Sequence, residues 1–116
     1  MPAKPNEDKK EIFRYYWKML ANFIVFPVIT EEYNFDSEIG RKHRFDFAFP
    51  DFMVAVEING NAWNVKGGGR HGQDKDLEKI NIAVSMGWKV FQFSPKMIKD
   101  DPERWVGMVQ RALQQS

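Results

Sequence analysis

Two apolar segments that each carry one acidic residue constrain the fold of this chain most strongly. Residues 44–49 read RFDFAF and residues 53–58 read MVAVEI, with a turn at Pro50 and Asp51 between them. Their alternating pattern and short separation predict two neighbouring strands joined as a hairpin. A carboxylate on an apolar strand is costly to bury unless it is paired or binds a cation. The two acids of the hairpin, Asp46 and Glu57, are therefore the first candidate site.

The alternation also assigns side chains to the faces of the predicted hairpin. In the first strand Asp46 shares a face with Ala48, and the three phenylalanines occupy the other face. In the second strand Glu57 shares a face with Ala55 and Asn59. Asp46 and Glu57 can thus face the same side of neighbouring strands, where paired carboxylates make a hard oxygen site suited to Mg²⁺ or Mn²⁺. The pattern predicts a metal site on this face.

Length and composition indicate one globular domain with a substantial core. Of the 116 residues, 43% are hydrophobic and 15% are aromatic. We expect residues 1–6 to be a disordered start and residues 7–116 to form the domain. The absence of cysteine excludes disulfides and a thiolate zinc site. No secretion signal and no apolar run of ~20 residues is found, so we expect a cytoplasmic protein of a bacterium or a virus-infected cell.

The order of the elements along the chain predicts the architecture of the sheet. Periodicity, glycine and proline indicate a helix at 7–22, short strands at 24–28 and 31–35, the hairpin, a long loop at 60–73, a helix at 74–86, a strand at 88–93, a helical turn at 95–99 and a last helix at 102–114. A helix that connects the strands 53–58 and 88–93 makes a crossover, so part of the sheet should be parallel. We expect an α/β fold, a mixed sheet of four to five strands flanked by helices, in the order α-β-β-β-α-β-α.

The second long helix has Asp74 as its predicted N-cap and a predicted core stripe of Leu77, Ile80 and Val84, flanked by Ala83. A helical wheel at ~100° per residue places Lys79 well away from that stripe. Lys79 is therefore as compatible with a solvent-exposed lysine as with a catalytic one.

Several short motifs occur in a fixed order along most of the chain. They are RFDFA at 44–48, VEING at 56–60, Trp63, GGRH at 68–71, DLEK at 76–79 and GWKV at 87–90. In this order and spacing, residues 31–95 resemble the PD-(D/E)XK nuclease superfamily, in particular its very-short-patch-repair-like branch of small phage and bacterial endonucleases. The resemblance implies a restriction-endonuclease-like fold and an Mg²⁺- or Mn²⁺-dependent endonuclease that hydrolyses DNA phosphodiester bonds.

Within that resemblance the metal ligands would be Asp46, Glu57 and the backbone carbonyl oxygen of Ile58. The metal would polarise the scissile phosphate and lower the pKa of an attacking water. For Asp46 the alternative is a structural salt bridge to Arg44 or Arg41.

A third acid often comes from the first helix in such folds. Glu11 is the best-placed residue for this further metal ligand, and Glu32 and Glu38 are alternatives. Each of the three is also explained as a solvated surface acid.

Two departures from the family pattern alter the expected mechanism. The signature lysine, two residues after the second acid, is Asn59 here, and an asparagine cannot act as a cationic stabiliser. Lys79 could stabilise the phosphate in its place, with Lys66 as a weaker substitute. The histidines of the very-short-patch enzymes are replaced by Asn59 and Asn64, so neither a histidine-assisted mechanism nor mismatch specificity is carried over. His71 remains as a general acid or base or a phosphate donor, or as an ordinary loop histidine.

Clusters of basic residues flank the hairpin and are candidates for contact with phosphates. The net charge of the chain is only +1, but a local cluster can serve even when the total is neutral. The candidate nucleic-acid-binding residues are Arg41, Lys42, Arg44, Lys66, Arg70, Gln73 and Lys75. The basic residues at 41–44 and those at 66–75, each group taken alone, are equally explained as solvated loop charges. The partner that the resemblance implies is DNA. We expect no association with a membrane.

Three functions remain open from the sequence. The first is an endonuclease that nicks DNA or selects it by structure with little sequence preference, and that is a homodimer if it cuts both strands. The second is a nucleic-acid-binding module of the same fold whose nuclease site has lost function, as Asn59 would allow. The third is a structural or partner-binding subunit whose acids are ion-paired. Metal binding separates the first from the others, and salt-dependent DNA affinity separates the second from the third.

Overall fold

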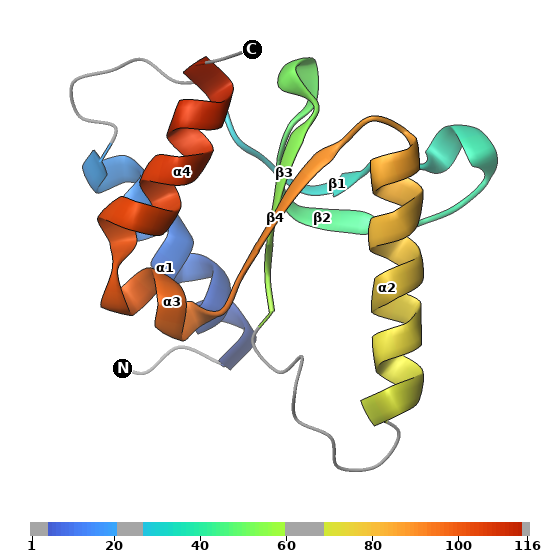
Figure 1. Ribbon diagram of the computed structural model, residues 1–116, viewed down its shortest axis with the longest axis horizontal. Coiled ribbons are helices and arrows are strands. Elements are labelled where there is room, and N and C mark those ends of the chain that lie inside the picture. Colours follow the sequence, from blue (N-terminus) through green and yellow to red (C-terminus); the bar gives the residue numbers. More distant parts are fainter. Residues whose placement is uncertain (1–4, 21–26, 60–68, 115–116) are drawn as a thin grey trace.

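Figure 1 shows a computed structural model of the chain, which describes residues 5–20, 27–59 and 69–114. Side chains are described for residues 9–20, 27–59 and 74–114. The elements in chain order are α1 (Pro5–Leu20), β1 (Thr30–Asn34), β2 (Arg44–Phe49), β3 (Val54–Ile58), α2 (Gly69–Ser85), β4 (Lys89–Phe93), α3 (Pro95–Asp100) and α4 (Pro102–Gln114). Short 3-10 turns, Ser37–Ile39 and Pro50–Phe52, follow β1 and β2.

The strands form one four-stranded mixed sheet in the order β1-β2-β3-β4. The pairs β1–β2 and β2–β3 are antiparallel, whereas β3 and β4 are parallel. The chain between the two parallel strands passes through α2, as a crossover connection requires. The predicted α/β class with a mixed sheet is confirmed, and the helical turn predicted at 95–99 is the short helix α3. Of the strand predicted at 24–28, residues 24–26 lie outside the described part, and Pro27 and Val28 are not in a strand.

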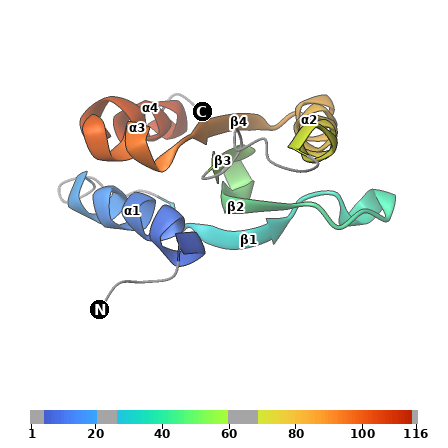
Figure 2. The same ribbon diagram turned by 90° about the horizontal axis from the view of Figure 1, so that it is seen from below.

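Helices cover both faces of the sheet. In Figure 1 and Figure 2, α1, α3 and α4 lie together on one side and α2 lies alone on the other. The α1-side core consists of Phe13, Trp17, Phe47, Phe49, Val54, Val56, Ile58, Phe93, Ile98, Val106, Val109 and Leu113. The α2-side core consists of Phe35, Phe45, Ala48, Ala55, Ala83 and Trp88. Among the described residues, no helix combines the length and hydrophobicity that crossing a membrane requires.

Helix α2 begins earlier than the sequence predicts. It starts at Gly69, so the loop predicted through residue 73 and the N-cap predicted at Asp74 were both wrong. Glycine in a helix interior costs about 1 kcal/mol relative to alanine but does not block helical hydrogen bonding as proline does. Residues 69–73 contain no proline, and the helix extends through them. Residues 60–68 of the predicted loop lie outside the described part of the chain.

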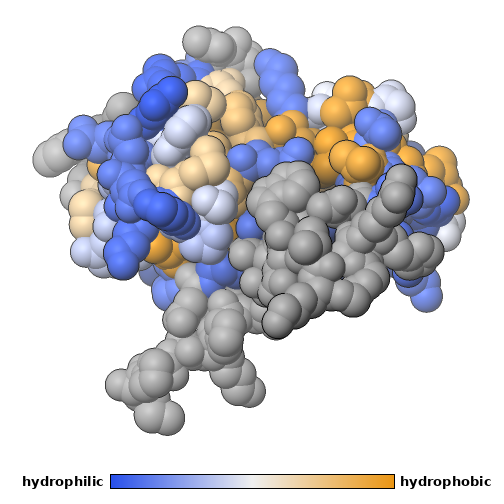
Figure 3. Space-filling view, turned by 60° about the horizontal axis from the view of Figure 1, so that its bottom comes forward, coloured by the Kyte–Doolittle hydropathy of each residue, from blue (hydrophilic) through white to orange (hydrophobic). Residues whose placement is uncertain are grey.

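Two residues of the predicted core stripe of α2 face solvent. Leu77 is 61% exposed and Val84 is 58% exposed, whereas Ala83 is fully buried. Aromatic rings of the α2-side core fill the space beneath the helix, so a small side chain allows the closest approach. In Figure 3 the strongest apolar colour accordingly lies toward the end of the molecule that carries α2. The stripe prediction was wrong for Leu77 and Val84, whereas Ile80 is half-buried and the predicted flanking residue Ala83 is buried. The inward face also carries Lys79.

This orientation of α2 predicts the stability of two variants. Leu77→Ser should change the free energy of unfolding by less than about 0.5 kcal/mol, because the leucine is exposed. Ala83→Leu should destabilise the protein by about 1–3 kcal/mol through overpacking. Urea unfolding followed by tryptophan fluorescence measures both changes. A larger loss of unfolding free energy for Leu77→Ser than for Ala83→Leu would contradict this orientation of α2.

Strand β2 changes the face that it presents at Asp46. Phe45 packs in the α2-side core and Phe47 in the α1-side core, although residues two apart share a face in a regular strand. On β1, Glu32 lies between the partners of these two phenylalanines and has a φ of 52°, in the left-handed region. Figure 1 shows the start of β2 diverging from β3. The prediction that three phenylalanines share a face is therefore wrong for Phe45, and Asp46 lies at a bend in the sheet.

Candidate functional site

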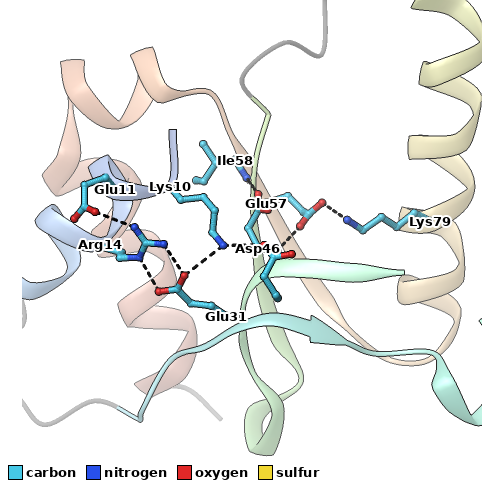
Figure 4. A network of polar contacts seen from close by, with 9 residues as sticks. Lys10, Glu11, Arg14, Glu31, Asp46, Glu57, Ile58 and Lys79 are labelled. Atoms are coloured by element: carbon cyan, nitrogen blue, oxygen red, sulfur yellow. Dashed lines mark hydrogen bonds and ion pairs between the residues drawn. The ribbon is translucent and has the colours of Figure 1, made fainter. Parts of the chain in front are cut away.

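Asp46 and Glu57 lie where β2 and β3 separate. The last described backbone pair between these strands joins Phe47 to Val56. Beyond it, the amide of Asp46 donates to Glu57 Oε2 at 2.7 Å, and the amide of Ile58 donates to Asp46 Oδ2 at 2.8 Å. Each carboxylate thus accepts from the opposite strand at a point where the backbone ladder has ended. The structure brings the two predicted acids together, as Figure 4 shows.

Lys79 reaches this acidic pair from α2. Its ammonium group forms an ion pair with Glu57 Oε1. The side chain of Glu57 is 10% exposed and that of Lys79 is 17% exposed, so solvent screens their interaction only weakly. The ammonium nitrogen also lies 6.0 Å from the centroid of the Phe45 ring. Of the two readings that the sequence left open for Lys79, the structure excludes the solvent-exposed lysine.

The surroundings of Glu57 raise its pKa. Burial is the largest cause, the positive charge of Lys79 opposes it, and the negative charge of Asp46 reinforces it. With both carboxylates ionised against one ammonium, the cluster carries a formal net charge of −1. A divalent cation would change this charge to +1, which favours a phosphate anion.

Asn59, which the sequence resemblance aligns with a signature lysine, is held by β4. Its backbone N–H donates to the carbonyl oxygen of Phe93 at 2.8 Å, and its side-chain Nδ2 donates to Gln92 Oε1 at 3.0 Å. Gln92 is also the register partner of Glu57. The sequence reasoning missed Gln92, because only the register of the parallel pair places it beside the acids.

The three candidates for a third acid are not part of the acidic pair. The carboxylate of Glu11 is 65% exposed and binds Arg14 at 3.0 Å, and Figure 4 shows it on the far side of Lys10 and Arg14 from the pair. Glu32 binds Lys10 at 2.7 Å, and Glu38 is exposed on a 3-10 turn. Within the described ranges, no group of three His, Cys, Asp or Glu residues is placed to hold a metal.

The predicted phosphate contacts are described in part. Lys42, Arg44 and Lys75 are exposed, and Arg41 is bound to α2 by an ion pair of 2.5 Å with Glu78. The acidic pair forms no salt bridge with an arginine of the described part. Lys66 and the side chains of Arg70, His71 and Gln73 lie outside the described residues, so their predicted roles stay predictions. Trp63 and Asn64 also lie outside them.

A second buried carboxylate, Asp36, also escaped the sequence reasoning. It is fully buried and accepts hydrogen bonds from Asn34 Nδ2 at 3.1 Å, from the amide of His43 at 3.0 Å and from His43 Nδ1 at 2.7 Å. These bonds close the turn between β1 and β2.

Comparison of the chain with protein-family models, with curated proteins and with solved structures found no match. The class that the structure defines is an α/β domain whose mixed sheet opens at an acidic pair bound by a lysine from the crossover helix.

Proposed function

We propose that this chain is an Mg²⁺- or Mn²⁺-dependent endonuclease with the restriction-endonuclease-like fold of the PD-(D/E)XK superfamily. Its substrate would be DNA, nicked with little sequence preference or selected by structure. The observation that carries the proposal is the reciprocal bonding of Asp46 and Glu57 where two strands separate, with Lys79 bound to the pair. A structural ion pair needs one acid and one base, and here a second acid adds negative charge that the lysine does not balance.

The topology supports the same proposal. The two acids come from the adjacent antiparallel strands β2 and β3, at the centre of the four-stranded sheet. The crossover helix α2 supplies Lys79 from the segment 76–79, which carries the family's D-x-x-K pattern. This is the arrangement that the sequence resemblance implies.

The donor set suits a hard divalent cation. The carboxylates of Asp46 and Glu57 and the predicted carbonyl oxygen of Ile58 offer oxygen ligands, and Mg²⁺ is commonly held by one or two carboxylates with water and substrate phosphate. Oδ1 of Asp46 accepts no hydrogen bond from the part of the chain that the structure describes, so it is available to a cation. Such a metal supplies polarisation of the scissile phosphate and a lower pKa for the attacking water.

Lys79 would provide the positive charge that Asn59 cannot. Its ammonium group neutralises the buried carboxylate of Glu57 and has further donors for an oxygen of a phosphate bound beside it. During hydrolysis, water forms a new bond to phosphorus and the bond to the leaving ester oxygen breaks. A fixed ammonium group stabilises the negative charge that the reacting phosphate carries.

Removal of metal tests the proposal directly. The wild-type protein should convert supercoiled plasmid to the nicked circle in Mg²⁺ or Mn²⁺, and EDTA should abolish the conversion. Metal alone should also raise the Tm, because a ligand that binds only the folded state stabilises it. Linear product would indicate two sites acting together, as in a homodimer. Absence of cleavage with both metals, on duplex and on branched DNA, would refute the proposal.

Asn59 favours a second candidate function, a nucleic-acid-binding module that has lost catalysis. Such a module would bind DNA through exposed cations such as Lys42, Arg44 and Lys75 without needing metal. Its affinity would fall steeply with salt concentration and would not change on addition of EDTA. Binding of this kind without cleavage would favour the module over the enzyme.

A further inference from the structure

Beside the acidic pair, β3 and β4 bring two amide side chains together. Ala55 and Val90 are register partners, and both pack on the α2 side of the sheet. Two residues further along each strand, Glu57 is the register partner of Gln92, so both side chains also point to the α2 side. Asn59 directly follows β3, and its side chain bonds to that of Gln92.

The amide of Asn59 has a defined orientation. Its Nδ2 donates to Gln92 Oε1 at 3.0 Å, so its Oδ1 points away from Gln92. An asparagine amide that lacks such a partner can rotate to exchange its donor and its acceptor. In this orientation, with Gln92 as the acceptor, the oxygen of Asn59 is left for another group.

This side-chain hydrogen bond is not needed to hold the sheet together. The backbone N–H of Asn59 already bonds to the carbonyl oxygen of Phe93, which continues the parallel pairing. A neutral hydrogen bond between exposed side chains adds little net stability, because water competes for both groups. Its main consequence is to order an amide beside the buried carboxylate of Glu57.

We propose that Gln92 is a positioning residue that acts through Asn59, an inference that rests on the proposed nuclease function. Held by Gln92, Oδ1 of Asn59 accepts a hydrogen bond from the attacking water. The oxygen of that water bonds to phosphorus with its electron pair, and the bond between phosphorus and the leaving ester oxygen breaks. One proton of the water passes to solvent, and the leaving oxygen takes up a proton from solvent.

This assignment divides between two residues what a lysine at position 59 would combine. Lys79 supplies the positive charge from α2, and Asn59 supplies the hydrogen bond to water from β3. An ammonium group has donors in all orientations and needs no acceptor on β4 to select one of them. Gln92 should therefore matter while position 59 is asparagine and cease to matter once it is lysine.

The experiment measures kcat and KM for plasmid nicking by variants at position 92. Gln92→Met removes the acceptor at similar length and should lower kcat about tenfold with KM unchanged. Gln92→Glu keeps an acceptor oxygen for Asn59 Nδ2 and should recover most of that loss. In an Asn59→Lys background, Gln92→Met should change kcat less than about twofold. Gln114→Met, at an exposed glutamine of α4, is the matched control and should have no effect.

The outcomes separate this inference from the proposal beneath it. An active wild type that nicks as fast as its Gln92→Met variant would overturn the role of Gln92 and leave the nuclease standing. An equal loss in the asparagine and lysine backgrounds would show a structural role that does not pass through Asn59, and would also overturn it. A wild-type protein that does not nick DNA would refute both the role of Gln92 and the proposed nuclease function.

Discussion

Asp46→Asn is expected to lower metal-dependent nicking by about a thousandfold or more while the protein stays folded. The substitution removes the negative charge that a divalent cation requires. It keeps the size of the side chain and an oxygen that can still accept from the amide of Ile58, so the opening of the sheet should survive. Plasmid nicking in Mg²⁺ and in Mn²⁺ measures the rate, and the rise of Tm on adding metal should disappear with it.

The matched control for this variant is Asp51→Asn. Asp51 is an exposed acid in the 3-10 turn between β2 and β3, so it shares the hairpin but not the acidic pair. Removal of the negative charge of Asp51 should leave nicking and the metal-induced shift of Tm unchanged. Equal activity of Asp46→Asn and wild type would show that the acidic pair is not the site of chemistry.

Lys79→Met is expected to reduce both nicking and stability. Nicking should fall about a hundredfold, because the charge that we propose stabilises the phosphate is lost. Methionine keeps an apolar stem near Phe45 but leaves the carboxylate of Glu57 buried without its counter-ion. Removal of one partner of a fully buried pair costs ~3–5 kcal/mol, and this pair is slightly exposed, so we expect a loss of about 2–3 kcal/mol at neutral pH.

The loss of stability in Lys79→Met should depend on pH. Burial already raises the pKa of Glu57 in the folded protein, and Lys79 opposes that rise, so removing Lys79 raises the pKa further. The folded state then binds this proton more tightly than the unfolded state. Stability is therefore highest below the ordinary pKa of the carboxyl group and falls as pH rises through the raised pKa. Urea unfolding between about pH 4 and about pH 8 should show the decline extending to higher pH in the variant than in wild type.

Two further variants test this explanation. Adding Glu57→Gln to Lys79→Met leaves no buried charge at this position and should restore most of the stability but not the nicking. Lys96→Met removes a lysine that is 82% exposed and should change neither property. A loss in Lys79→Met that is the same at every pH would attribute the effect to packing rather than to the charge of Glu57.

The strands were the most predictable part of the fold. The segment predicted at 44–49 is β2 with the same bounds, and the segment predicted at 53–58 is β3 from Val54. Alternation and a short turn are local signals, so they can be recognised without knowledge of the rest of the chain. The meeting of Asp46 and Glu57 follows from the same signals, because a hairpin register is set by its turn.

The rotation of α2 could not be predicted in this way. A helical wheel shows which residues share a face, but it does not show which face a sheet will accept. Leu77 and Val84 are the more hydrophobic choice, yet Ala83 is the residue that fits over the large rings beneath the helix. The inward position of Lys79 depends on this fit.

By itself, the sequence determined the class of the fold, the crossover that makes β3 and β4 parallel, and the pairing of two acids on adjacent strands. These follow from periodicity and connection length, which are properties of short segments and their order. Only the tertiary structure decided that Lys79 binds Glu57, that Asn59 donates a hydrogen bond to Gln92, and that Phe45 leaves the face of its neighbours. Each of these contacts joins elements distant in sequence, and their geometry depends on how closely the elements pack and where the sheet bends.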